Sequence, residues 1–160
     1  MRGLRALVLV AVAFVAVTWP GAVYAQGAVM ADLQAHLDAM KITTTKAGTD
    51  AVEFSAGFDA AKSRKFFARL DAKANFLYLA IVDLPKLDAK DPKWCDRAKT
   101  ILRLNYGLAL SKLEWDESTG ELRLSRSVAT EKGIGRDELN AMIQDLLASV
   151  EAVEARLAAN

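Results

Sequence analysis

Cys95 is the only cysteine in the sequence, and His36 is the only histidine. With a single thiol, no intramolecular disulfide can hold the fold together, so its stability must come from the burial of apolar side chains. We expect Cys95 to be a buried structural thiol. The alternative is a reactive or dimer-linking thiol, because a place in the first turn of a helix favours the thiolate form.

Sequence motifs that carry catalysis are also missing. There is no His-x-x-x-His pair and no Gly-x-Ser-x-Gly turn, and Gly133-Ile134-Gly135 lacks the third glycine of a phosphate-binding loop. His36 lies at the edge of an apolar helical stripe, where a partly exposed helix residue is expected and not a metal ligand. We therefore predict no catalytic residue, no metal site and no cofactor.

A strong excess of charge of either sign is absent as well. The sequence has 21 basic and 20 acidic side chains, a formal net charge of +1. This balance gives no drive toward nucleic acid through counterion release, so we expect no nucleic-acid partner. Lys62, Arg64 and Lys65 form a local basic cluster. We interpret the cluster as the solvated end of a strand, and a polyanion site is the second interpretation.

The N-terminus has the three parts of a secretory signal peptide. Two arginines precede an uncharged apolar run from Ala6 to Trp19, and Val23-Tyr24-Ala25 supplies a small-residue cleavage site. The run is shorter than the roughly 20 residues of a membrane-spanning helix, although an uncleaved anchor is the alternative. We expect residues 1–25 to be removed and residues 26–160 to form one domain. The protein would then be periplasmic or secreted, and would meet the membrane only during export.

The spacing of apolar residues divides the remaining chain into helices and strands. It predicts a helix over residues 29–41 and a helix of roughly 34 Å over residues 136–158. A third helix is expected to start at Asp91-Pro92, an N-cap acceptor followed by proline at the first helical position. Its apolar face is expected to carry Trp94, Ala98, Ile101, Leu102, Asn105 and Leu108. Alternation predicts strands within residues 42–56 and over 64–71, although residues 60–70 can also be written as a short helix.

Residues 75–82 are apolar at both odd and even positions, which is typical of a central strand covered on both faces. One helix layer covers one face, so a second layer or a second subunit would have to cover the other. Alternatively, part of the run is an exposed patch that awaits a partner. The last helix has a heptad pattern and is longer than a small sheet is wide, so its end offers another surface for a partner or a second copy. The candidate residues for binding a partner or a second copy are Leu77, Leu79, Val150, Val153 and Leu157.

A β-hairpin is predicted with a defined register near residue 118. Pairing Trp115 with Leu122 also pairs Leu113 with Leu124, which places four large apolar side chains on one face. The loop ends at Gly120, where a left-handed backbone conformation is often required. A slip by one residue would turn the apolar set toward water, so the pairing is strongly specified.

The segments 97–107 and 112–124, followed by the amphipathic helix at the C-terminus, resemble the YbjN family of bacterial proteins. The shared pattern is an asparagine late in a helix, a strand, an Asp-containing turn that ends in glycine, and a second strand. The family fold is similar to that of class I type III secretion chaperones, which commonly dimerise and bind extended client segments. The resemblance implies that Asn105 and Gly120 are fold-determining positions and that the protein binds partners.

We therefore expect an α+β fold with an antiparallel sheet of about five strands, in the order α-β-β-β-α-β-β-α. The predicted function is a non-catalytic periplasmic binding or chaperone-like module whose partner is a protein or a second copy. Two alternatives stay open. A small enzyme would draw on Asp83, Asp88, Asp91, Asp96 and His36. A carrier of a small apolar ligand would use Phe66, Phe67, Tyr78 and Trp115.

Overall fold

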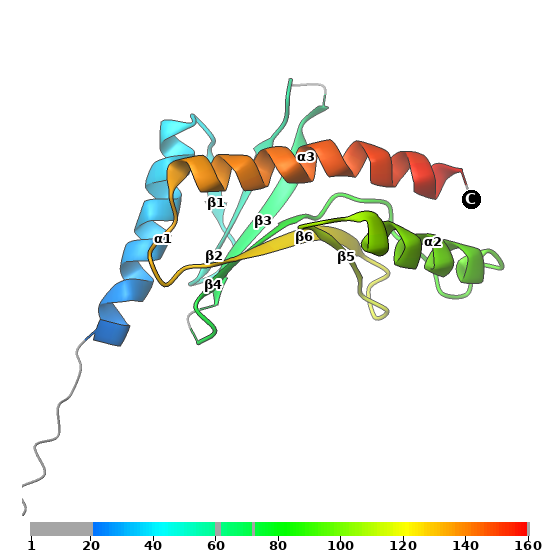
Figure 1. Cartoon of the computed structure of the whole chain (residues 1–160), viewed down its shortest axis with the longest axis horizontal. Helices are drawn as coiled ribbons and strands as arrows, with labels where there is room; N and C mark the ends of the chain where they lie inside the picture. The colour runs from blue at the N-terminus through cyan, green and yellow to red at the C-terminus, as the bar shows by residue number, and fades with distance from the viewer. Residues whose placement is uncertain (1–20, 60–61, 72, 160) are drawn as a thin grey trace, which may run out of the picture.

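A computed structural model describes residues 21–59, 62–71 and 73–159 (Figure 1). These residues form three helices and a six-stranded antiparallel sheet, which confirms the α+β fold. Most of the predicted signal peptide, residues 1–25, lies outside the described residues. Within the described part of the chain, no helix is long and apolar enough to cross a membrane.

Four strands, and not three, precede the middle helix. In chain order the elements are α1 Gly21–Ala39, β1 Thr44–Lys46, β2 Ala51–Ala56, β3 Arg64–Asp71, β4 Phe76–Ile81, α2 Trp94–Gly107, β5 Lys112–Trp115, β6 Leu122–Ala129 and α3 Arg136–Ala158. Their order across the sheet is β1-β2-β3-β4-β6-β5, and every pairing is antiparallel. The predicted strand region 42–56 contains two of the four, because β1, a three-residue edge strand, forms a hairpin with β2.

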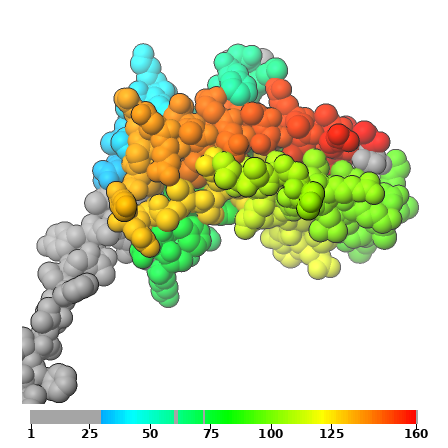
Figure 2. Space-filling model, viewed as in Figure 1, coloured from blue at the N-terminus to red at the C-terminus, as the bar shows by residue number. Residues whose placement is uncertain are grey.

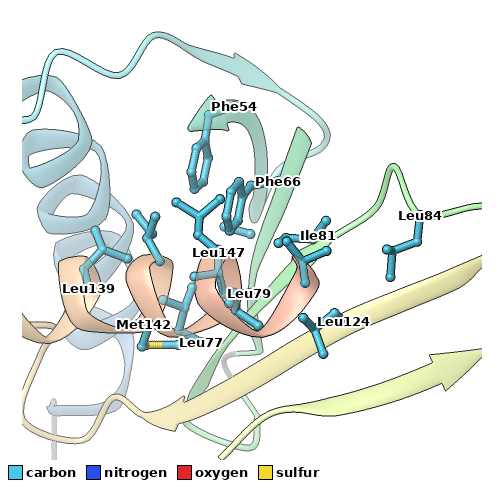
Figure 3. Packing of buried hydrophobic residues seen from close by; sticks show 14 of the residues in the cluster. Phe54, Phe66, Leu77, Leu79, Ile81, Leu84, Leu124, Leu139, Met142 and Leu147 are labelled. Atoms are coloured by element: carbon cyan, nitrogen blue, oxygen red, sulfur yellow. The ribbon is translucent and has the colours of Figure 1, made fainter. Parts of the chain in front are cut away.

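The helices pack on one face of the sheet, here called the core face. Buried side chains of β2, β3 and β4 alternate along each strand and point toward α3, as Figure 3 shows for Phe54, Phe66 and Leu79. α3 crosses this face. α1 contacts the N-terminal half of α3, and α2 lies beside α3 (Figures 1 and 2). The buried residues of α3 are Leu139, Met142, Ile143, Leu146, Leu147, Val150 and Val153. The apolar stripe of the last helix is therefore used within the chain itself.

The hairpin of β5 and β6 has the predicted register. Trp115 pairs with Leu122 and Leu113 with Leu124, and the backbone at Gly120 is left-handed with φ +72°. An added Cβ at Gly120 would lie 2.8 Å from the carbonyl oxygen of Leu87, so the position needs glycine for space as well as for conformation.

Asn105 joins α2 to the edge strand β5. Its amide nitrogen donates to the carbonyl oxygen of Leu113 at 3.1 Å, and its amide oxygen accepts from the backbone N–H of the same residue at 2.6 Å. The side chain thus pairs both polar backbone groups of one strand residue, which an edge strand otherwise leaves to solvent.

Three expectations about the middle helix are wrong. The helix begins at Trp94 and not at Asp91-Pro92, because the Asp91 side chain accepts from the amide of Lys93 at 2.8 Å and forms a turn before the helix. Cys95 is exposed and not buried, and Leu102 is 69% exposed. The rest of the predicted apolar face faces inward, since Ile101 is buried and Trp94 and Leu108 pack against the core, so Leu102 is the exception on that face.

Candidate functional site

The face of the sheet opposite the helices, here called the open face, carries no helix within the described residues. The strand registers place alternate residues on it. The open-face residues are Ala51, Glu53, Ser55, Lys65, Phe67, Arg69, Asp71, Phe76, Tyr78, Ala80, Lys112, Glu114, Arg123, Ser125, Ser127 and Ala129. The described residues therefore cover β4 on one face only, because all three helices pack on the core face, and cover of the other face by a second subunit stays a prediction.

The centre of the open face is apolar and uneven. Phe67, Phe76 and Tyr78 are half-buried there, while Ala80 and Ser125 are small and fully buried in the sheet. None of the three aromatic side chains packs against the core of the molecule. Large rings beside small side chains make the surface uneven, so side chains of another protein can fit between the rings. An exposed apolar area of this kind is typical of an interaction surface.

Tyr78 anchors a polar network beside this apolar centre. Its hydroxyl donates to Glu114 at 2.6 Å, and Glu114 also pairs with Lys112. Burial and the Glu114 carboxylate raise the pKa of Tyr78 to about 12, so the phenol stays neutral and remains a donor near neutral pH. Burial raises the pKa of Glu114, but hydrogen bonds from Lys112 and Tyr78 outweigh it and lower that pKa on balance. The network therefore holds the Tyr78 ring in place on the open face.

A shallow cavity extends the open face toward the β1 edge. Its volume is about 440 Å³, and its lining includes Thr45, Glu53 and Lys65 of the first three strands. The Lys65 ammonium pairs with Glu53 at 3.2 Å across two strands. The edge of the open face is thus polar and charge-balanced, in contrast to its apolar centre.

A second apolar surface lies on the outer side of α2. Leu102 is 69% exposed, Tyr106 95% and Leu110 63%. Leu102 and Tyr106 are four residues apart and so share one side of the helix, with Leu110 just beyond its end. These three residues are called the α2 stripe below. Within the described residues, none of the three packs against the hydrophobic core.

The basic cluster lies where the β2–β3 hairpin projects past α3 (Figure 2). Lys62 donates to Glu151 at 2.8 Å, and Arg64 forms a two-point pair with Glu154. These pairs border a cavity of about 560 Å³ between the hairpin and α3. Each cation of the cluster, Lys65 included, thus has an acidic partner, so the cluster offers no free basic patch to a polyanion.

The residues predicted to bind a partner lie almost entirely in the core. Leu77, Leu79, Val150 and Val153 are buried, and Leu157 is partly exposed near the end of α3. Their own chain covers these four side chains, although Val150 lines the cavity between the β2–β3 hairpin and α3. A direct contact of these residues with a partner stays a prediction, and the open face and the α2 stripe are two apolar surfaces that the described residues leave exposed.

The acidic residues considered for an enzyme are used locally. Asp83 accepts from the Lys65 amide, Asp88 from the Lys90 amide and Asp91 from the Lys93 amide, while Asp96 pairs with Lys99. Among the described residues, no group of three or more His, Cys, Asp or Glu side chains is placed to hold a metal ion.

His36 and the aromatic residues likewise fail to converge on a site. His36 is half-buried, and its Nε2 atom lies 2.9 Å from the carbonyl oxygen of Ile134, where it ties α1 to the segment before α3. Phe66 lies on the core face, whereas Phe67 and Tyr78 lie on the open face. The four aromatic residues proposed for a ligand carrier therefore do not line one cavity.

The fold relates the chain to known structures. YbjN from E. coli superposes with a TM-score of 0.56 at 16% identity, over 81% of this chain and 90% of that chain. This chain shares the YbjN fold. The HopA1–SchA chaperone–effector complex contains a chain that matches with a TM-score of 0.55 at 13% identity, over 84% of this chain and 95% of that chain. A chain of the ExsC–ExsE complex matches with a TM-score of 0.52 at 14% identity, over 81% of this chain and 96% of that chain.

The resemblance to YbjN and to chaperones of this fold is confirmed at the level of the fold. Identities of 13 to 16% carry no residue-by-residue comparison, so these likenesses show architecture alone. No protein-family model matches the chain, and no curated protein matches it.

Proposed function

We propose that this protein is a non-catalytic, chaperone-like module of the YbjN fold that binds an extended segment of a protein partner on its open face. The observation that carries the proposal is the apolar centre of that face, where three aromatic side chains remain without a covering layer. A chaperone–effector complex of the same fold supports the proposal.

An extended segment fits the open face better than a compact ligand does. The aromatic residues come from adjacent strands, and they lie on a broad surface. A segment in extended conformation presents every second side chain to such a surface, so its apolar residues can meet Phe67 and Phe76 while its backbone stays accessible to water or to a sheet edge. Partner recognition of this kind needs no catalytic group.

We also propose that the protein works in the periplasm or outside the cell. The signal-peptide pattern of residues 1–25 supports this location. Mass spectrometry of the exported protein tests it, because cleavage after Ala25 would leave Gln26 at the N-terminus, and an intact N-terminus would contradict it.

Peptide selection tests the open face. We expect peptides from a random 12-residue display library to bind the wild-type protein and to lose at least tenfold in affinity for Phe67→Ser, because an aromatic anchor at the centre of an interface contributes most of its energy. Phe76→Ser, which removes a second aromatic side chain from the same face, is expected to weaken binding as well.

Leu102→Ser is the matched control, since it removes an exposed apolar side chain from the α2 stripe instead. It should bind the selected peptides as the wild type does. Melting curves of all variants confirm that they are folded. Peptides that bind Phe67→Ser and Phe76→Ser with unchanged affinity would contradict binding at the open face.

The α2 stripe suits a second copy of the chain. Two α2 helices that meet about a two-fold axis would cover Leu102 and Tyr106 of both copies, and a symmetric pair is the commonest assembly of soluble proteins. We expect light scattering to give the mass of a dimer for the wild type and for Phe67→Ser, and the mass of a monomer for Tyr106→Asp. A monomeric wild type would rule out this assembly and leave the open face unaffected.

A further inference from the structure

We propose that the open face selects partner segments that carry a carboxylate side chain, and that Arg69 is the residue that binds it. This inference rests on the proposed function, and it adds the chemistry of the partner. It follows from the position of Arg69, from the charges around it and from the effect of covering it.

Arg69 lies at the centre of the open face. Its backbone pairs with Ala51 of β2 on one side and with Tyr78 of β4 on the other. The side chain is exposed, and its guanidinium carbon lies 6.0 Å from the centre of the Tyr78 ring. A guanidinium held over an aromatic ring is attracted to the ring face and keeps hydrogen-bond donors free at its edge.

Every other cation of the open face has an acidic partner. Lys65 pairs with Glu53 at 3.2 Å, and Arg123 pairs with Glu121 at 2.7 Å. Lys112 pairs with Glu114, which in turn accepts from Tyr78. Within the described residues, Arg69 has no carboxylate partner, so it is the unbalanced charge of this face.

The acidic side chain nearest to it along the strand is also in use. Asp71, two residues from Arg69, accepts from the amides of Lys73 and Ala74 at 3.0 Å and so shapes the β3–β4 turn. It does not neutralise Arg69, yet it adds negative charge on that side. One carboxylate therefore suits the site, whereas a run of negative charges, as in a nucleic acid, does not.

When a partner segment covers the open face, the loss of water around Arg69 determines which side chain of the partner is favoured next to it. A segment that lies on Phe67 and Tyr78 removes water from Arg69 between them. A buried charge without a partner is strongly unfavourable, so an apolar or basic side chain placed there opposes binding. A carboxylate accepts two hydrogen bonds from the guanidinium edge, and these replace the hydrogen bonds that Arg69 loses to water. The preferred partner is thus an extended segment with an acidic residue two positions from an apolar one.

Three display libraries test this preference directly. Each presents 12-residue peptides that are random except for one central residue, which is fixed as glutamate, glutamine or lysine. The targets are the wild-type protein, Arg69→Gln and Lys73→Gln. Lys73 is an exposed cation in the β3–β4 turn, outside the apolar centre, and serves as the matched control.

On the wild type and on Lys73→Gln, we expect recovery from the glutamate library to exceed that from the glutamine library by about tenfold or more, as charge-assisted hydrogen bonds imply. On Arg69→Gln the ratio should fall close to one. Equal recovery from both libraries on the wild type would overturn the inference, as would the same preference on Arg69→Gln. If all libraries bind equally and Phe67→Ser abolishes binding, the proposed function stands and the carboxylate preference falls. If no library binds, both fall.

Discussion

Replacement of Phe66 by alanine is expected to lower the free energy of unfolding by about 3–5 kcal/mol. The ring is fully buried on the core face, where it stacks on Phe54 with centroids 5.1 Å apart. Its strand neighbours Phe54 and Ile81 are themselves buried and cannot move far into the space that the ring leaves. Truncation therefore leaves a cavity in addition to the lost transfer energy. Urea denaturation, followed by circular dichroism, measures the loss.

Phe67→Ala is the matched control for this change. The two residues are adjacent in β3, but Phe67 points to the open face and is only half-buried. Its removal should cost less than half as much stability, because water already reaches part of the ring and no closed cavity forms. A similar loss for both variants would mean that the open face is covered within the chain.

Replacement of Asn105 by alanine is expected to cost about 2–3 kcal/mol, because each unpaired and partly buried backbone group is costly. The variant loses both hydrogen bonds to the backbone of Leu113, one at each end of the side-chain amide. Without them, β5 is paired only with β6. Chemical denaturation measures the stability, and hydrogen exchange of the Leu113 amide, observed by NMR, should become faster.

Asn140→Ala provides the comparison. Asn140 is an exposed residue of α3, and alanine is the better helix former, so this variant should be as stable as the wild type or slightly more stable. Unchanged exchange of the Leu113 amide in Asn105→Ala would show that the Asn105 side chain does not hold β5.

The register of the last hairpin was predictable because two local features, the alternation of apolar residues and the position of glycine in the turn, indicate the same pairing. The alternation of Leu113 and Trp115 sets which side chains are buried, and Gly120 sets where the chain turns. The span of α3 was predictable for a similar reason, since its apolar repeat continues without interruption from Leu139 to Val153. Such elements depend on contacts close in sequence.

The limits of the inward face of α2 and the covered face of β4 were not predictable from local sequence. Spacing places both Ile101 and Leu102 on the apolar side of α2, but the packing of the helix buries Ile101 and leaves Leu102 exposed. β4 is apolar at every position, so its sequence does not indicate which side the helices cover. That side depends on where distant segments pack.

For the same reason, the sequence predicted Phe67 and Tyr78 only as residues of a small-ligand site and did not predict Arg69 at all. Phe67 and Arg69 share one parity in β3, opposite to Phe66, Ala68 and Leu70, so the alternation of the strand contained their common face. The sequence did not indicate that this face lacks a helix. The partner contacts predicted from the sequence instead include Leu77 and Leu79, which the helices cover, and Leu157, which is partly exposed.

The one-sided packing of the sheet links the stability of the protein to its occupancy. A ligand that binds only the folded state raises the free energy of unfolding as its concentration rises above its dissociation constant. Because the open face exists only when β3, β4 and β6 are paired, a segment bound there would clamp these strands together. If a partner segment binds there as proposed, the empty protein would be the least stable form, and heat resistance would report the fraction of the protein that is occupied.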